Sequence, residues 1–275
     1  MLLQRVVTAL CLLVLILGVL FWGSQTAWVV LTLPVLGIVL WEWSRLLVRS
    51  AVLPILIGTG AAFAYHLLRA QGVPPMGLLP VLGTGTLVWL AVAVPSVLCA
   101  SPAGPASSVW LACLFMFNLW VALYELRLSG PWILLSAMAI VWLADIGAYF
   151  AGRALGRHKL APRVSPGKTW EGVVGGMAVV IGAALLVWVS SEGDGTAIFS
   201  SMLAGHFGVF GMIGALIVLV MISVLGDLFE SLLKRHAGVK DSSNILPGHG
   251  GVFDRIDALV PSMPLCLLLL MLMLP

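Results

Sequence analysis

The 275 residues are 61% hydrophobic and 9% charged, with a mean hydropathy of +1.13 and a formal net charge of +3. A chain this apolar lacks the polar surface that covers a water-soluble globule. This excludes a soluble one- or two-domain protein and indicates that lipid surrounds most of the chain. The charges gathered late in the chain have both signs and do not form a basic tail, so we expect no nucleic-acid partner.

Apolar segments recur along the chain, and a helix needs roughly 20 such residues to cross about 30 Å of hydrocarbon. Nine candidates run near residues 6–22, 27–41, 51–68, 78–99, 109–126, 131–151, 173–190, 206–229 and 258–274. The first could instead belong to a signal peptide, but its apolar run is long and another follows at once. We predict an all-α polytopic membrane protein of about nine transmembrane helices. About five spans form an N-terminal membrane region, 1–130, and the rest form a C-terminal catalytic region, 131–275.

Lysine and arginine are distributed unevenly between the two sides of such a bundle. If the N-terminus is cytoplasmic and the spans alternate, twelve of the 14 Lys and Arg side chains lie inside, and only Arg69 and Arg127 lie outside. The positive-inside rule therefore predicts a cytoplasmic N-terminus and a C-terminus on the outer side. The two longest connections, 152–172 and 230–257, then both face the cytoplasm.

Asp145 lies within the sixth apolar segment, in WLADIGAYF. A carboxylate at such a depth costs about 3 kcal/mol unless it is paired or lines a wet cavity, so it is a functional candidate. An ion-coupled transporter could also place an acid here. Transporters often contain two repeated halves, however, and this sequence shows no internal repeat.

The connection 152–172 reads GRALGRHKLAPRVSPGKTWEG and is basic. Attraction to anionic lipid headgroups explains its first cations, such as Arg157. Four polar side chains lie together near its end: Ser165, Lys168, Thr169 and Glu171. Their grouping favours contact between Lys168 and a substrate phosphate. A P-loop is excluded, because a proline stands where the pattern GxxxxGK[ST] needs its first glycine.

Polar residues also line one face of the segment MISVLGDLFESLLKR. They recur at helical spacing: Ser223, Asp227, Glu230, Ser231 and Lys234. A helix end that emerges into water explains the last of them, but not Ser223 and Asp227, which lie a turn deeper. Gly226 beside them would let another backbone approach closely.

The stretch KRHAGVKDSSNILPGHGGVFDRID, residues 234–257, holds seven of the 25 charged side chains and two His. Asp254 and Asp257 are three residues apart, so their carboxylates share a helix face. Helix capping would explain one of them. A carboxylate pair at the membrane boundary favours Mg²⁺, which usually also binds phosphate oxygens. The glycines of GHGG can form a plain turn or bring backbone N–H groups to an anion, and the neighbouring cations fit a polyphosphate.

The run SLLKRHAGVKDSSNILPGHGGVFDRID, residues 231–257, resembles the signature of the phosphatidate cytidylyltransferases, or CDP-diacylglycerol synthases, at every position of that pattern. The likeness extends through 145–172 and 223–231. Two positions differ from many members of that family, since Ile146 replaces a Thr or Ser and Gly167 replaces a Lys. The first five spans are similar only in being apolar.

The resemblance implies that CTP and phosphatidate react to give CDP-diacylglycerol and pyrophosphate at the cytoplasmic face of the bacterial inner membrane. It also implies Mg²⁺ as cofactor, with a second cation left open, and a homodimer. Another magnesium-dependent enzyme of lipid phosphates, such as a polyprenol kinase or a sugar-phosphate transferase, would need similar acids. Nothing in the residues themselves selects cytosine.

The motifs and the resemblance together define a candidate site. The catalytic candidates are Lys234, Arg235, Lys240, Asp241, His249 and Arg255. The substrate-binding candidates are Ser165, Lys168, Thr169, Glu171, Ser223, Ser231, Gly248, Gly250 and Gly251. The metal-binding candidates are Asp145, Asp227, Asp254 and Asp257.

Overall fold

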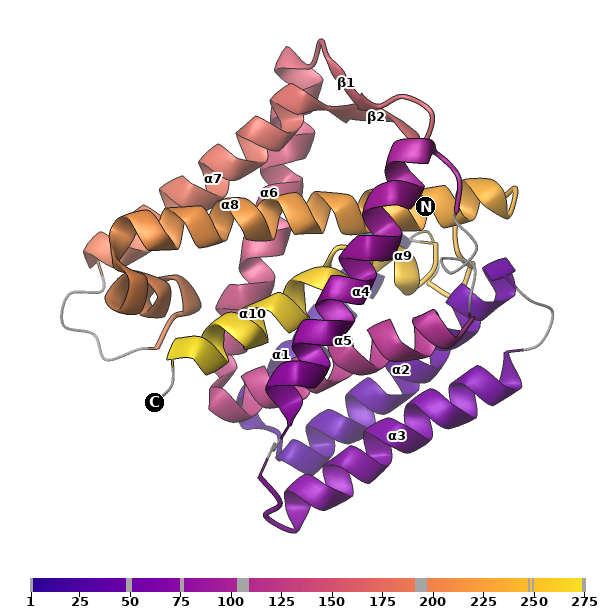
Figure 1. The fold of residues 1–275 in the computed structure, drawn as a ribbon, viewed down its shortest axis with the longest axis vertical. Coiled ribbons are helices and arrows are strands. Elements are labelled where there is room, and N and C mark those ends of the chain that lie inside the picture. Colours follow the sequence, from indigo (N-terminus) through magenta and orange to yellow (C-terminus); the bar gives the residue numbers. More distant parts are fainter. Residues whose placement is uncertain are drawn as a thin grey trace.

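The computed structural model describes residues 2–47, 51–74, 77–102, 109–190, 197–246, 248 and 250–273, with side chains from residue 10 onward. The described chain consists of helices and one two-stranded sheet (Figure 1). The helices are α1 (Leu2–Trp22), α2 (Gln25–Leu47), α3 (Val52–Ala70), α4 (Leu78–Cys99), α5 (Val109–Ser129), α6 (Pro131–Leu155), α7 (Trp170–Ser190), α8 (Phe199–His236), α9 (Phe253–Ile256) and α10 (Leu259–Met273). The strands β1 (Lys159–Ala161) and β2 (Ser165–Thr169) lie between α6 and α7.

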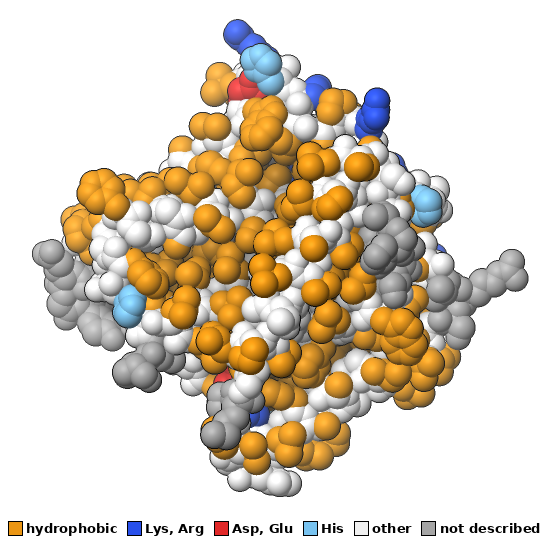
Figure 2. Space-filling model, viewed as in Figure 1, with side chains coloured by type: hydrophobic (Ala, Val, Ile, Leu, Met, Phe, Trp, Pro, Cys, Tyr) orange, Lys and Arg blue, Asp and Glu red, His pale blue; other side chains and the backbone are white. Residues whose placement is uncertain are grey.

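The helices have the length and surface of membrane spans. Eight helical stretches are long and apolar enough to cross a membrane, with α9 and α10 counted together as Phe253–Met273, and α1 adds a shorter apolar stretch, Leu10–Trp22. Large apolar side chains lie on the outside, such as Trp22 at 84% and Phe210 at 91% exposed. Figure 2 shows hydrophobic side chains over most of one face, with Lys and Arg side chains near the hairpin end. The predicted all-α polytopic membrane fold is confirmed.

α8 is longer than the predicted span 206–229 and is not straight. Gly208 interrupts it with φ 73° and ψ 170°, a conformation that favours glycine, so the helix changes direction there. The helix also continues beyond residue 229. Glu230 and Lys234 lie one turn apart there and form an ion pair at 2.6 Å, which stabilises the extra turns.

The expected loop 152–172 is mostly regular structure. α6 continues to Leu155, α7 begins at Trp170, and β1 and β2 form an antiparallel hairpin between them. α6 and α7 pack side by side and carry the hairpin at their end (Figure 1). Small residues permit this packing, because a Cβ added to Gly176 would lie 2.7 Å from the carbonyl oxygen of Ala144.

α10 lies at the centre of the molecule, where it packs against α4, α5, α6 and α8 (Figure 1). It is apolar on all sides, as expected of a helix that other helices surround. Its Cys266 has no exposed surface, and the same core contains Met116 of α5 and Leu216 of α8. The two predicted regions therefore contribute to one hydrophobic core, and the boundary at residue 130 stays a prediction.

Candidate active site

The β1–β2 hairpin packs against the end of α8 through a small hydrophobic cluster. Val164, Leu228 and Leu232 are buried in it, and Leu160 and Ala161 pack against them. Removing such side chains from water favours the contact. The cluster therefore brings the polar end of the hairpin to the polar face of α8.

Lys168 of β2 forms the polar link between these two elements. Its Nζ lies 2.6 Å from Oδ2 of Asp227, and Ser231 donates a hydrogen bond to Oδ1 of the same carboxylate at 3.3 Å. The side chains of Lys168 and Asp227 remain 23% and 34% exposed, so a dissolved phosphate group can reach them. The prediction that Asp227 and Ser231 share a helix face is confirmed.

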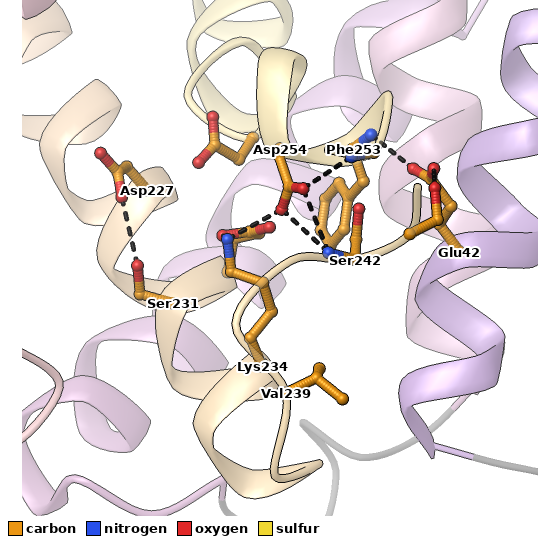
Figure 3. Close-up of polar contacts among 12 residues, drawn as sticks. Glu42, Asp227, Ser231, Lys234, Val239, Ser242, Phe253 and Asp254 are labelled. Atoms are coloured by element: carbon orange, nitrogen blue, oxygen red, sulfur yellow. Dashed lines mark hydrogen bonds and ion pairs between the residues drawn. The ribbon is translucent and has the colours of Figure 1, made fainter. Parts of the chain in front are cut away.

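Asp254 is the centre of a second set of contacts (Figure 3). The Nζ of Lys234 lies 2.8 Å from its Oδ1 and 2.6 Å from a carboxylate oxygen of Glu230. The backbone N–H of Ser242 donates to both oxygens of Asp254 at 3.2 and 3.1 Å, and that of Gly251 donates to Oδ2 at 2.8 Å. The surrounding protein therefore already binds this carboxylate on several sides.

The glycines of the signature form a tight turn around Asp254. Gly248 and Gly250 have φ values of +76° and +81°, in the left-handed region that favours glycine. Gly251 has no room for a side chain, because a Cβ there would lie 2.7 Å from Oε1 of Glu42 and would also overlap the Oγ of Ser242. These glycines form a turn, and the N–H of Gly251 binds a carboxylate of the protein itself, while their role in binding substrate stays a prediction.

Three other carboxylates gather beside Lys168. Asp145 of α6, Asp227 of α8 and Asp257, which follows α9, are electrostatic neighbours of one another. No Lys or Arg of the described residues forms an ion pair with Asp145 or Asp257. Lys168 alone leaves this acidic cluster with excess negative charge, which favours binding of a cation.

Gly226 sets the distance between α8 and the segment that carries Asp257. A Cβ on Gly226 would lie 2.8 Å from the carbonyl oxygen of Asp257 and 3.0 Å from Cγ of Pro261. The predicted close approach at Gly226 is confirmed. The carboxylate of Asp257 accepts a hydrogen bond from the backbone N–H of Ala258 at 2.8 Å, which fixes its position beside α8.

The acidic cluster can supply only part of the ligands of a magnesium ion, so phosphate oxygens of the substrate would have to supply others. No three His, Cys, Asp or Glu side chains in the described parts of the chain are placed to hold a metal ion by themselves. Mg²⁺ does not need such a group, because it commonly binds one or two carboxylates together with water and phosphate oxygens. Asp227 and Asp257 are the neighbouring carboxylates that would bind an ion in this way, whereas the oxygens of Asp254 already bind Lys234 and the loop.

Three predicted substrate-binding residues have local partners. Thr169 accepts a hydrogen bond from the first turn of α7 at 3.1 Å. The carboxylate of Glu171 lies 2.5 Å from Nδ1 of His158, and Ser223 donates to the backbone carbonyl of Val220 at 2.9 Å. These contacts stabilise the hairpin and helices, and a role of these residues in binding substrate stays a prediction.

Most of the remaining candidates lie in or beside the loop of residues 242–253, here called the signature loop. Arg235 donates a hydrogen bond to the carbonyl of Val239 at 3.2 Å. Ser165 is the first residue of β2. His249 lies outside the described residues. Arg235 is exposed at the surface, as are four other candidates of this segment: Lys240, Asp241, Gly248 and Arg255.

The sequence interpretation missed a buried acid of α2. Glu42 has no exposed surface, and its carboxylate accepts hydrogen bonds from the backbone N–H of Val252 at 3.0 Å, from that of Phe253 at 2.6 Å and from the hydroxyl of Ser243 (Figure 3). The neighbouring Trp43 stacks on Phe253 with ring centroids 4.9 Å apart. The available signal was an acid between two tryptophans, WEW, at the end of an apolar segment.

Comparison with known proteins points to one family of enzymes. The sequence model of the cytidylyltransferase family matches residues 3–273. The phosphatidate cytidylyltransferase of Pseudomonas aeruginosa is 37% identical over 264 residues, which cover 89% of this chain and 88% of that protein. The enzyme of the same name from Haemophilus influenzae is 47% identical over 116 residues, 42% of this chain and 38% of its own. That of Staphylococcus aureus strain COL is 41% identical over 124 residues, 44% and 42% respectively.

Proposed function

Because the chain belongs to the cytidylyltransferase family, we propose that it transfers a cytidylyl group from CTP to phosphatidate, giving CDP-diacylglycerol and pyrophosphate. The observation that carries the proposal is a cluster of four charged residues from four separate parts of a membrane protein: Lys168 of β2, Asp145 of α6, Asp227 of α8 and Asp257 after α9. An acidic cluster with one exposed cation suits a nucleoside triphosphate that arrives with a metal ion.

The reaction joins two anions, and the residues of the chain would lower the cost of bringing them together. An oxygen of the lipid phosphate attacks the α-phosphorus of CTP, and the bond from that phosphorus to the oxygen of the pyrophosphate leaving group breaks. Lys168, partly exposed beside Asp227, would contact a phosphate oxygen. The exposed Arg235, Lys240 and Arg255 lie around the signature loop and would attract the nucleotide.

Asp227 and Asp257 would hold Mg²⁺ in this proposal, with Asp145 as their electrostatic neighbour and a second cation left open. When bound, the ion would supply positive charge to the phosphate oxygens of CTP. Asp254 would hold the signature loop, since its oxygens already bind Lys234, Ser242 and Gly251.

The setting of the reaction belongs to the same proposal. The bacterial relatives and the apolar helices support a multi-pass protein of the inner membrane. The distribution of Lys and Arg supports a site at the cytoplasmic face, where CTP is available. A homodimer is part of the proposal too, and the mass of the detergent-solubilised protein by light scattering would test it.

One assay tests the reaction and separates it from its nearest alternative. Purified protein in detergent is incubated with phosphatidate, Mg²⁺ and CTP labelled in the α- or the γ-phosphate. Cytidylyl transfer puts only the α-label into the lipid phase, whereas a lipid kinase puts only the γ-label there. Lipid labelled from γ-CTP, or no lipid label from α-CTP with wild-type protein, would overturn the proposal. ATP and UTP serve as nucleotide controls.

A further inference from the structure

The buried carboxylate of Glu42 contacts the signature loop from the N-terminal half of the chain. Its exposed surface is 0%, and no Lys or Arg of the described residues forms an ion pair with it. A buried charge without a cation is costly unless hydrogen bonds satisfy it. Among the described residues, the hydrogen bonds that satisfy it come from the loop, from Ser243, Val252 and Phe253.

Glu42 and Asp254 hold the same loop through neighbouring residues. Asp254 binds the N–H groups of Ser242 and Gly251. Glu42 binds the next residue at each end of the loop, Ser243 through its hydroxyl and Val252 through its N–H. The two carboxylates therefore close residues 242–253 from opposite sides, and Figure 3 shows Glu42 and Asp254 on either side of this segment.

Glu42 also fixes the residue that precedes Asp254. The N–H of Phe253 donates to Oε2 of Glu42 at 2.6 Å, while the ring of Phe253 stacks on Trp43. Both the backbone and the side chain of Phe253 are thus held by consecutive residues of α2. Since Asp257 lies one helical turn beyond Phe253, a shift of this residue would also shift Asp257 relative to Asp227.

We propose that Glu42 is a positioning residue for cytidylyl transfer, which sets the signature loop and thereby the distance between Asp257 and Asp227. The inference rests on the proposed function, because it assumes that the chemistry occurs at this acidic cluster. A positioning role requires the negative charge and both carboxylate oxygens, since each oxygen accepts a backbone N–H. A role in filling space would require only the shape of the side chain.

Two substitutions separate the positioning role from the space-filling role. The first role predicts that Glu42→Asp is the more active variant, and the second predicts that Glu42→Gln is. Glu42→Gln keeps the size of the side chain, but its NH₂ group must face one of the two N–H donors. Glu42→Asp keeps both acceptors and the charge on a shorter stem. We expect kcat/KM to fall about 30-fold or more in Glu42→Gln and clearly less in Glu42→Asp. Glu42→Gln as active as wild type, or more active than Glu42→Asp, would overturn the inference.

Hydrogen–deuterium exchange gives a second readout that does not depend on activity. Amides of residues 244–253 should exchange at least about threefold faster in Glu42→Gln than in wild type, while α6 and α7 stay unchanged. Unchanged exchange in the loop would contradict the inference. Wild-type turnover in the same assay tests the proposed function separately.

Glu125→Gln is the matched control. Glu125 is also a buried acid of the N-terminal half, but it pairs with Arg69 at 2.7 Å and lies outside the signature loop. Its substitution should lower the Tm in detergent and leave both the loop exchange and kcat/KM of the folded protein near wild type. If neither Glu42 variant is recovered folded, Ser243→Ala provides the test, because it removes one hydrogen bond between the loop and Glu42. It should accelerate exchange of the loop, and wild-type exchange in that variant would overturn the inference.

Discussion

The Nζ of Lys168 lies 2.6 Å from Oδ2 of Asp227, although the two residues are 59 positions apart in the sequence. The pair joins the β hairpin to α8, and both side chains remain partly exposed. Lys168 therefore neutralises an acid of the cluster while staying accessible to a phosphate. Arg157 lies in the same connection, exposed before β1, and forms no ion pair with an acid of the described residues.

The first prediction compares these two cations. Lys168→Ala should lower kcat/KM by roughly 30- to 1000-fold, because a charge-assisted phosphate contact in a partly buried site is lost. Arg157→Ala should change kcat/KM by less than about tenfold, with an effect that fades at high salt, since it acts by long-range attraction. Turnover of CTP measured at low and high salt checks both values. Equal effects of the two substitutions would mean that the connection is only a basic surface.

The second prediction distinguishes Asp227 from Asp254, which the sequence analysis both named as metal-binding candidates. Asp227→Asn should reduce turnover by more than tenfold and weaken the response to Mg²⁺, while the Tm in detergent stays near wild type. Asp254→Asn should lower the Tm as well, because Lys234 and the loop N–H groups lose their shared acceptor, a loss of about 1–3 kcal/mol. Thermal unfolding and a Mg²⁺ titration of each variant provide the measurements. A stable Asp254→Asn protein with normal loop exchange would contradict this assignment.

Helical spacing was enough to predict part of the site. The face shared by Asp227 and Ser231 and the close approach at Gly226 both follow from local sequence, because a helix fixes which side chains lie together. The partner of Asp254 could not be predicted in this way. Whether the oxygens of Asp254 bind a metal ion or backbone N–H groups depends on how the loop folds back onto them. This folding brings Ser242 to Asp254, and local sequence patterns do not predict it.

The fold class was predicted correctly, but the regular structure between the spans was not. Hydropathy locates the spans, and the helical spacing of the polar residues from Ser223 to Lys234 correctly predicts that the eighth helix continues past residue 229. Neither pattern shows that SPGKT forms a strand, since Pro and Gly are uncommon within strands. Glu42 was missed for a different reason. The tryptophans beside it mark an acid at the end of an apolar segment, but nothing near it in the sequence indicates that its partners are backbone N–H groups more than 200 positions away.

The third prediction tests the orientation of the spans. In a variant without its four native Cys, single cysteines are introduced at Gln71 and Asn244, which are both exposed. The positive-inside rule places position 71 outside and position 244 in the cytoplasm. An impermeant thiol reagent should label position 71 in intact cells and position 244 only after lysis. Asn244 is preferred to Ser243, which is buried against Glu42. Labelling of position 244 in intact cells would reverse the topology and remove the access to cytoplasmic CTP.

The last prediction concerns the contact between α8 and the chain at Asp257. Gly226→Ala would place a Cβ 2.8 Å from the carbonyl oxygen of Asp257, so the backbone that carries this acid must move. Backbone atoms cannot move aside as easily as the end of a flexible side chain. We therefore expect a lower Tm and a loss of kcat/KM of more than about tenfold. Gly214→Ala is the matched control in the same helix, since a Cβ there meets nothing within 4 Å. That variant should be as active as wild type and stable to within about 1 kcal/mol, with any change in the direction of greater helix stability. The two variants differ only in what the added methyl group meets, so equal activity would show that the spacing of α8 and Asp257 does not limit the reaction.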